Sequence, residues 1–370
     1  MINIITIIKI NNQNKGKKMN KLTKILLVVL STLSIAINAI AGELTVTGTA
    51  KASYTIGGSD QNAGKGIGIS NEVGLGATGE LDNGMKWSYA LALDTTSTDN
   101  VVDNDDQSLT LTTPYGTLGA FITTGGLSTE HSWGIGAIGV GSDLISPMTS
   151  VFGSDVSTYS NVQYHLPAGL LPLGVVAKVG HAPNLANNET YAADYKTVGN
   201  QNSEELGQSA SHYQVSAAPV AGLTVIADYF ETSGARTKGQ APTSGNISAK
   251  YTTGPVSIGY RKGYSDVGIT AKSTAVTNYD NDAYGIQFAV NDQLSVSYSV
   301  EKTTARTRAA IVAAAAGAVK TEKESTLTHI QAAYNIGGAT VGIARVEGDD
   351  SDYTTSKDES ITLLSIAMAF

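Results

Sequence analysis

Residues 294–301 read Leu-Ser-Val-Ser-Tyr-Ser-Val-Glu, and this strict alternation of apolar and polar side chains decides the fold. Successive side chains of a β-strand point to opposite faces, so such a segment has one apolar and one polar face. The same pattern runs through residues 85–94, where Met, Trp, Tyr and two Leu alternate with Lys, Ser, Ala and Asp. The sequence therefore predicts an all-β protein built from two-faced strands.

Sixteen segments follow this pattern, and every second connection between them is short. The short connections contain turn-forming residues, such as Asp82-Asn83-Gly84 and Gly254-Pro255. The others are polar and longer, roughly ten to thirty residues each, which is typical of a 16-stranded antiparallel transmembrane β-barrel with short periplasmic turns and long extracellular loops. We expect the strands near residues 43–56, 67–80, 85–96, 107–113, 117–124, 157–166, 172–181, 210–218, 222–231, 244–252, 256–264, 281–290, 293–302, 325–335, 339–347 and 359–370.

The first forty-one residues differ from the rest of the chain. Lys21 and Lys24 precede an apolar run from Ile25 to Ile37, and Ala39-Ile40-Ala41 has the small residues of a cleavage site. This order is typical of a secretory signal peptide; the alternative is a retained N-terminal anchor. The expected division is an upstream extension over 1–18, a cleaved signal peptide over 19–41 and the barrel domain over 42–370.

Composition excludes several classes of protein. The chain has a net charge of −8, 40 Gly and no Cys, so it has neither the clustered basic residues of a nucleic-acid-binding protein nor disulfides. After residue 41 no apolar run is long enough for a membrane helix, so a membrane span must consist of strands. The five histidines show no metal-ligand spacing, and we expect no enzyme activity, cofactor or metal site. A barrel hydrolase is the alternative; it needs a Ser–His pair facing the lipid, with His165 and His212 as candidates.

The C-terminal segment 359–370 has Leu364, Ile366 and Met368 on one face and ends with Phe370. The leader, the sixteen alternating segments, a long third loop and this terminal aromatic residue together resemble the trimeric general porins of Gram-negative bacteria. The resemblance implies a homotrimer in the cell outer membrane, surrounded by lipid and lipopolysaccharide, with Phe370 presented to the outer-membrane assembly machinery. It also implies a water-filled channel for passive diffusion of small hydrophilic solutes and ions. A substrate-specific channel and a surface structural or adhesive β-protein remain as alternatives.

In general porins the third loop folds into the barrel and narrows it, and the matching segment here is residues 125–157. Alternation also assigns one charged side chain to the inner face of each of several strands. Acids on the loop opposite bases on the wall would set a transverse electric field in the pore. The predicted constriction comprises Glu130, Asp143 and Asp155 on the loop with Lys51, Lys178, Lys250 and Arg261 on the wall. The same logic points Glu72, Asp94, Asp228 and Glu301 inward.

One later stretch departs from the pattern. Residues 309–316 read Ala-Ala-Ile-Val-Ala-Ala-Ala-Ala, which is unusually apolar for an extracellular loop. For the segment 304–324 we therefore expect a short helix packed on the rim of the barrel.

Overall fold

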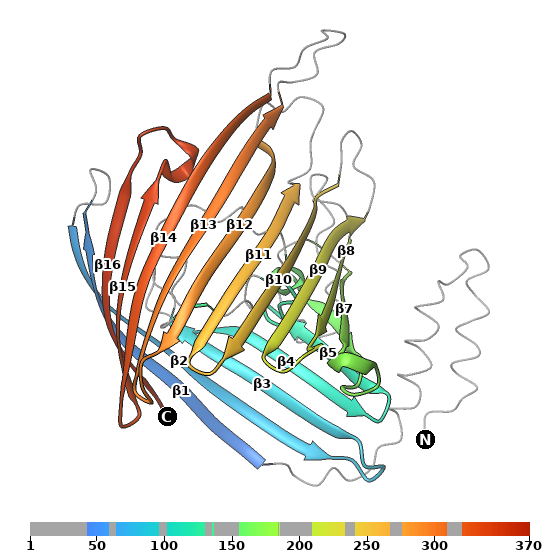
Figure 1. Ribbon diagram of the computed structural model, residues 1–370. Helices are drawn as coiled ribbons and strands as arrows, with labels where there is room; N and C mark the ends of the chain where they lie inside the picture. The colour runs from blue at the N-terminus through green and yellow to red at the C-terminus, as the bar shows by residue number, and fades with distance from the viewer. Residues whose placement is uncertain are drawn as a thin grey trace, which may run out of the picture.

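The computed structural model describes residues 43–58, 64–95, 102–129, 135–136, 155–183, 185, 209–233, 241–266, 276–308 and 320–370. Its sixteen strands form one closed antiparallel barrel in which each strand pairs with its neighbours in sequence, and the first pairs with the last (Figure 1). The strands are β1 (Glu43–Gly57), β2 (Gly64–Glu80), β3 (Lys86–Thr95), β4 (Val102–Thr113), β5 (Gly116–Ile122), β6 (Asn161–His165), β7 (Val176–Ala182), β8 (Ser209–Ala217), β9 (Leu223–Ser233), β10 (Thr243–Thr253), β11 (Val256–Asp266), β12 (Val276–Ala289), β13 (Leu294–Arg308), β14 (Lys320–Ile336), β15 (Ala339–Asp349) and β16 (Glu359–Ala369). The predicted fold class is confirmed.

Within the described ranges, three short 3₁₀ turns lie in the connections: η3 (Val156–Thr158), η4 (Pro172–Gly174) and η5 (Ser351–Tyr353). Among the described residues, no helix has the length and apolar character needed to cross a membrane.

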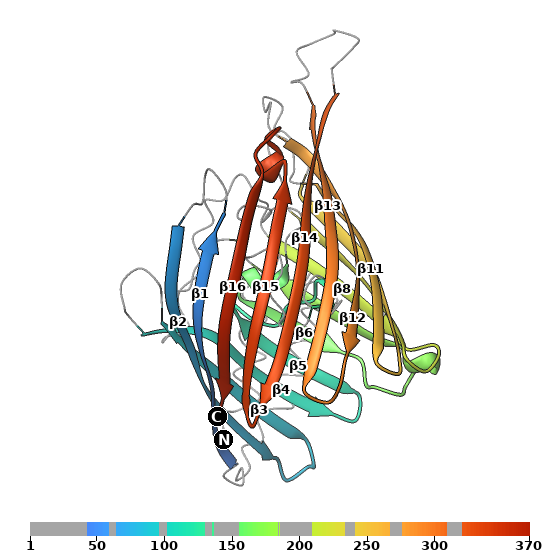
Figure 2. The same ribbon diagram turned by 60° about the vertical axis from the view of Figure 1, so that its left-hand side comes forward.

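The barrel closes at the C-terminal residue. Gly48 and Phe370 exchange two backbone hydrogen bonds, of 2.8 and 2.9 Å, and Figure 2 shows β1 and β16 side by side. The Phe370 ring lies directly over Gly48, where a Cβ atom would come within 2.3 Å of its Cζ. Closure pairs the backbone groups that an open sheet would leave at its two edges, as a lipid environment requires.

Polarity is reversed relative to a soluble protein. The outer face exposes large apolar side chains at every second strand position, for example Ile258, Ile330 and Ile366. The inner face carries the alternate residues, among which many polar side chains are buried: Gln163, Gln214, Asn246, Ser248, Ser297, Thr303 and Gln331. The pleat of the strands alone produces this separation, because neighbouring residues point to opposite sides.

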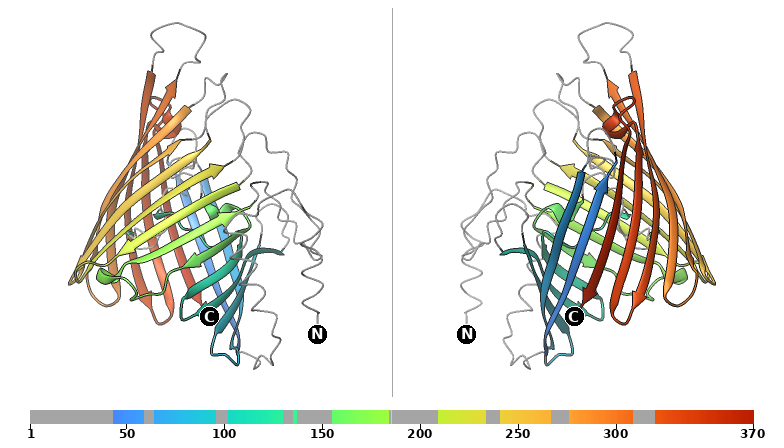
Figure 3. Two further views of the ribbon diagram at one scale, coloured as in Figure 1. Left: turned by 90° about the vertical axis from the view of Figure 1, so that its right-hand side faces the viewer. Right: turned by 90° about the vertical axis from the view of Figure 1, so that its left-hand side faces the viewer.

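Long and short connections are sorted to opposite ends of the barrel (Figure 3). Five connections at the long-loop end are shorter than the ten residues expected as a minimum: 234–242, 267–275 and 350–358 have nine residues each, and 58–63 and 96–101 have only six. For the last two, the reason is that β2 begins earlier, at Gly64, and β4 begins at Val102, since the ladders with β1 and β3 continue beyond the apolar part of the pattern.

Two predicted strands are shorter than expected. Residues 157–160 and 172–175 lie outside β6 and β7, because η3 and η4 precede these strands. Leu173 takes a left-handed φ of 60°, which is incompatible with a strand, so its place in the apolar alternation is coincidental.

The expectation of a helix over 304–324 is wrong for the first and last parts of this segment, which are β-strands. β13 continues to Arg308 and β14 starts at Lys320, paired in unbroken register. Alternating polar residues extend the ladder here, and outward ion pairs link the strands: Arg306 Nε lies 2.9 Å from Glu322 Oε1, and Lys302 Nζ lies 3.1 Å from Glu324 Oε1. The alanine-rich residues 309–316 lie outside the described part of the chain.

Candidate functional site

The third loop, which leaves β5 and returns through η3 to β6, is anchored inside the barrel at both of its feet. Leu127 from the first foot and Val156 from the second are fully buried in one apolar cluster. The wall contributes inward-facing residues of β7, β8 and β9, namely Ala182, Ala210 and Phe230. Burial of apolar surface in this cluster stabilises the docked loop by about 25 cal/mol for each Å² removed from water. The cluster therefore favours a loop held against the inner wall.

Asp155 ties the two feet together. Its Oδ1 accepts backbone N–H bonds from Leu127 (3.1 Å) and Ser157 (3.0 Å), and its Oδ2 accepts one from Ser128 (2.7 Å). The side chain also caps η3 at its N-terminus. A single carboxylate thus satisfies three backbone donors that have no ladder partner.

The wall holds this carboxylate through His212 of β8, whose side chain is fully buried. Its Nδ1 lies 3.3 Å from Asp155 Oδ1, and its Nε2 lies 3.4 Å from Asp228 Oδ1 on β9. An imidazole with hydrogens on both nitrogens donates to one carboxylate on each side. His212 therefore joins the loop to two strands of the wall.

Asp228 adds a direct contact to the loop. Its Oδ2 accepts the backbone N–H of Thr129 at 2.7 Å, and its Oδ1 accepts the side-chain amide of Asn246 at 3.0 Å. Asn246 fits only because position 263 is glycine: a Cβ atom there would lie 2.1 Å from Asn246 Oδ1. Gln214 completes the set by donating to the carbonyl of Leu127 at 2.7 Å.

The electrostatics of the foot favour an ionised Asp155. Burial alone raises the pKa of its carboxyl group, but the hydrogen bond and charge of His212 and the amide bonds from Ser157 and Ser128 outweigh burial and lower the pKa from 3.8 to about 2. Asp155 therefore stays negative at every pH a cell surface ordinarily meets.

A second contact lies much farther along the loop. Ile135 is buried against Ala283 of β12, and the N–H of Gly136 donates to Gln287 Oε1 at 3.4 Å. Gly285, between these two wall positions, lacks a Cβ that would lie 2.7 Å from Ile135 Cγ2. All three wall residues face inward, since Tyr284, Ile286 and Phe288 are exposed outside. The described residues of the third loop thus contact the inner wall at two places, β8 and β9 near its feet and β12 at Ile135 and Gly136.

The seven predicted constriction residues fall into separate places. Glu130 and Asp143 lie outside the described residues. Asp155 lies at the buried foot of the loop instead of on the side that faces the open lumen. Arg261 is only 1% exposed. Its guanidinium lies 3.7 Å from Glu301 Oε2 and donates a hydrogen bond to Asn281 at 3.2 Å. Lys51, Lys178 and Lys250 lie on the inner wall and are half-buried.

Two of these lysines lie near the short-turn end. Lys178 is two residues from the start of β7, and Lys250 is three from the end of β10. Lys51 lies in the middle of β1, where it pairs with Ala367 of β16 and Ser70 of β2. Within the described part of the chain none of the three forms an ion pair. Lys178 and Lys250 thus add positive charge to the inner wall near its short turns, whereas Lys51 lies on another sector, next to β2.

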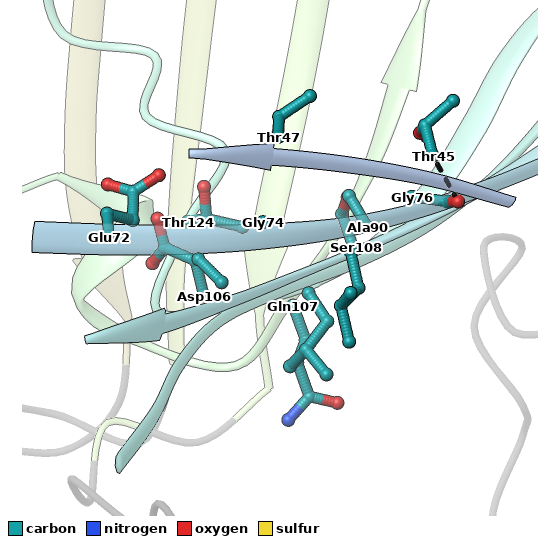
Figure 4. Close-up of a pocket in the computed structure, with 13 residues that line it drawn as sticks. Thr45, Thr47, Glu72, Gly74, Gly76, Ala90, Asp106, Gln107, Ser108 and Thr124 are labelled. Atoms are coloured by element: carbon teal, nitrogen blue, oxygen red, sulfur yellow. Dashed lines mark hydrogen bonds between the residues drawn. The ribbon is translucent and has the colours of Figure 1, made fainter. Parts of the chain in front are cut away.

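Opposite charge gathers on another sector of the wall. A pocket on the inside of β1–β4 is lined by Glu72, Asp106 and Thr124, whose polar groups lie close together in Figure 4. The backbone of Glu72 pairs in register with that of Asp94 on β3. The acids Glu72 on β2 and Asp106 on β4 and the bases on β7 and β10 thus occupy different sectors of the lumen. Of the inward acids predicted, Glu72 lines the open lumen, whereas Asp228 and Glu301 are buried.

The comparisons with known proteins agree with this architecture. No family model matches the sequence, and the curated proteins give no match. Among solved structures, an anion-selective porin from Comamonas acidovorans matches with a TM-score of 0.61 and 13% identity, over 89% of this chain and 100% of that one. OmpT, an outer membrane protein of Vibrio cholerae, matches with 0.59 and 13%, over 90% and 100%. A mutant porin of Rh. blastica matches with 0.58 and 12%, over 89% and 100%. The chain thus has the sixteen-stranded barrel fold of these porins and outer-membrane proteins.

Proposed function

We propose that this protein is an outer-membrane porin, a water-filled channel for passive diffusion of small hydrophilic solutes and ions. One observation carries the proposal: the third loop is held inside the barrel at its feet, by Asp155 and Asp228, and in its course, by Ile135. A ring of sixteen strands is too wide for side chains to fill. A loop fixed across the inner wall then sets the size limit of the channel.

The arrangement of lumenal charge supports the same function. Lys178 and Lys250 on one side and Glu72 and Asp106 on another give the lumen regions of both signs. Such a wall orients dipolar solutes and disfavours apolar ones. The constriction role of Glu130 and Asp143 is part of this proposal.

The apolar outer face supports a location in the outer membrane, which is part of the proposal. It suits the lipid of the outer membrane, with the short turns in the periplasm, the long loops outside among lipopolysaccharide, and export through a cleaved signal peptide. We propose a homotrimer, since OmpT of Vibrio cholerae has a trimer form with this fold. We propose that the assembly machinery recognises Phe370. Its side chain is 68% exposed, and its backbone pairs with Gly48 where the barrel closes.

We propose that the channel is not an enzyme. His165 and His212, the sequence candidates for a lipid-facing hydrolase, face inward instead. Another pair does face outward: His181 Nδ1 lies 3.2 Å from Ser211 Oγ. Ser211 pairs with a strand on each side, through His181 and Glu231, so the ladders occupy the backbone amides that an oxyanion hole would need.

The test is single-channel recording of the refolded protein in a planar bilayer under a salt gradient. A porin gives stepwise conductance, with three levels per insertion if it is a trimer. Saturable block by one solute class would indicate a substrate-specific channel. A folded, heat-modifiable barrel with no conductance would refute the proposal and leave a plugged barrel or a surface scaffold.

A further inference from the structure

A second loop also enters the barrel, at the long-loop end between β15 and β16. It contains η5, which Figure 2 shows at the top of these two strands. Tyr353 of this turn is only 9% exposed and packs with Tyr279, Ala305, Leu327 and Val346. These four residues belong to β12, β13, β14 and β15, in that order.

All four contacts are on the inner wall. Their neighbours in sequence face outward, for example Ile330 on the same strand as Leu327 and Ile343 on the same strand as Val346. Strands lie about 4.8 Å apart, so a contact that runs from β15 to β12 covers roughly 14 Å of the circumference. The loop therefore lies across the mouth of the lumen as a strap, defined here as residues 350–358, with Tyr353 at its tip.

The strap is held in a conformation that its backbone does not favour. Asp350, Asp352, Tyr353 and Ser356 all have φ between 50° and 61°, a region that residues other than glycine rarely adopt. Such strain persists only where surrounding contacts impose it. Two of these contacts are short hydrogen bonds within the strap, Ser356 N–H to Asp350 Oδ1 at 2.6 Å and Ser351 N–H to the Lys357 carbonyl at 2.8 Å.

At the tip of the strap, the ring of Tyr353 is well packed but its hydroxyl group is not well hydrogen-bonded. The Tyr353 hydroxyl is buried near Thr303, but it makes no hydrogen bond of ordinary geometry with any described residue. A buried hydroxyl without a partner loses the hydrogen bonds that water would give it. Ring burial thus favours the closed strap, whereas backbone strain and the hydroxyl oppose it.

From this balance we propose that the strap is a second constriction of the channel, at its outer mouth, and that Tyr353 determines how large a solute can enter. The inference rests on the proposed porin function. The third loop sets one size limit inside the barrel, and the strap sets another above it by opening and closing over the wall of β12–β15.

The experiment measures swelling of proteoliposomes in sugars of increasing size for the full-length barrel and two variants. Tyr353→Ala removes the ring that holds the strap, so the largest sugars should enter about tenfold faster relative to the smallest. Tyr353→Phe keeps the ring and removes the unsatisfied hydroxyl, so large sugars should enter more slowly than in the wild type. Tyr115→Ala, at an exposed tyrosine of a short turn, is the matched control. An unchanged size dependence in Tyr353→Ala overturns the proposal.

A second measurement does not depend on transport. Lys357 in the strap is 16% exposed and pairs with Glu359 at 3.7 Å, so trypsin can reach the bond that follows it only when the strap lifts. Compared with the wild type, cleavage after Lys357 should be faster in Tyr353→Ala. It should be about tenfold slower in Tyr353→Phe, because removal of one unsatisfied hydroxyl stabilises the closed strap. Equal cleavage rates in all three proteins refute the strap even if the barrel conducts. The expected order of cleavage in a barrel without conductance would instead retain the strap and refute the porin. If Tyr353→Ala does not fold, the Tyr353→Phe comparison alone decides.

Discussion

Replacing Asp155 by asparagine should detach the third loop from the wall while the barrel stays folded. The carboxylate accepts N–H groups on both oxygens, from Leu127 and Ser157 on one and from Ser128 on the other. An asparagine side chain of the same shape offers a single oxygen, so its NH₂ group must face at least one of these donors. The substitution also removes the negative charge beside His212.

The size of the effect follows from these contacts. A hydrogen bond to a buried charged group contributes about 1.5–3 kcal/mol, and an orphaned buried donor adds a further cost. We expect Asp155→Asn to weaken loop attachment by about 3 kcal/mol, which raises the population of detached loops about a hundredfold. The strand ladders do not involve this side chain, so unfolding of the barrel itself should change little.

Hydrogen exchange at the amides of Leu127, Ser128 and Thr129 measures the attachment directly. Their exchange should accelerate about a hundredfold in Asp155→Asn, and open-channel current noise should increase as the loop moves. Asp292→Asn, at an exposed acid of a short turn, is the control. Unchanged protection of these amides in the variant would show that the apolar cluster alone holds the loop.

Acid should have the same effect as the substitution. The pKa of Asp155 is lowered from 3.8 to about 2, so its contribution to attachment is complete above pH 4 and is lost as the pH falls through about 2. The difference corresponds to about 2 kcal/mol. Exchange protection of the wild-type amides should therefore fall between pH 4 and pH 2, whereas Asp155→Asn should show no such step.

Three further outcomes test other parts of the structure. Gly285→Val should push the third loop off β12 and raise single-channel conductance, whereas Gly64→Ala, in open space, should leave it unchanged; equal conductance would place the loop elsewhere. Lys178→Glu with Lys250→Glu alters the lumenal charge by four units and should move the reversal potential toward cation preference, and an unmoved potential would mean that ions do not sense these positions. Ile330→Arg puts a charge on the outer face and should destabilise the barrel in lipid by about 2–4 kcal/mol in denaturant titration; wild-type stability would show that this position does not contact hydrocarbon.

The sequence predicted the barrel because one local rule, the alternation of faces, operates in every strand. The rule also placed Lys51, Lys178 and Lys250 on the inner face, where the structure has them. It needs no knowledge of distant contacts, since the pleat fixes the side of each residue once the strand is known. The failed expectation over 304–324 shows its limit: an apolar run in the middle of a connection indicated a helix, yet the strands on either side continue in register.

The alternation rule does not predict where along the barrel axis a side chain lies or which distant residues it contacts. Asp155 was expected to face the pore, yet its ligands are backbone amides about thirty residues earlier in sequence and a histidine fifty-seven residues later. Arg261 was expected at the constriction and is instead buried beside Glu301. These pairings depend on strand stagger around the ring, which short-range alternation does not encode.

A signal for both inserted loops is nevertheless present in the alternation. Phe230, Leu327 and Val346 are apolar residues at inward positions, where a wall that faces water should be polar, and all three are almost fully buried. Each has a loop residue packed on it: Phe230 lies in the cluster at the foot of the third loop, and the other two contact Tyr353. Leaving such side chains exposed to an aqueous lumen would cost about 1.5–3 kcal/mol each, so a barrel sequence retains them only where another part of the chain covers them. Apolar residues at inward positions therefore mark where loops dock inside a barrel, and their strands identify which part of the circumference each loop covers.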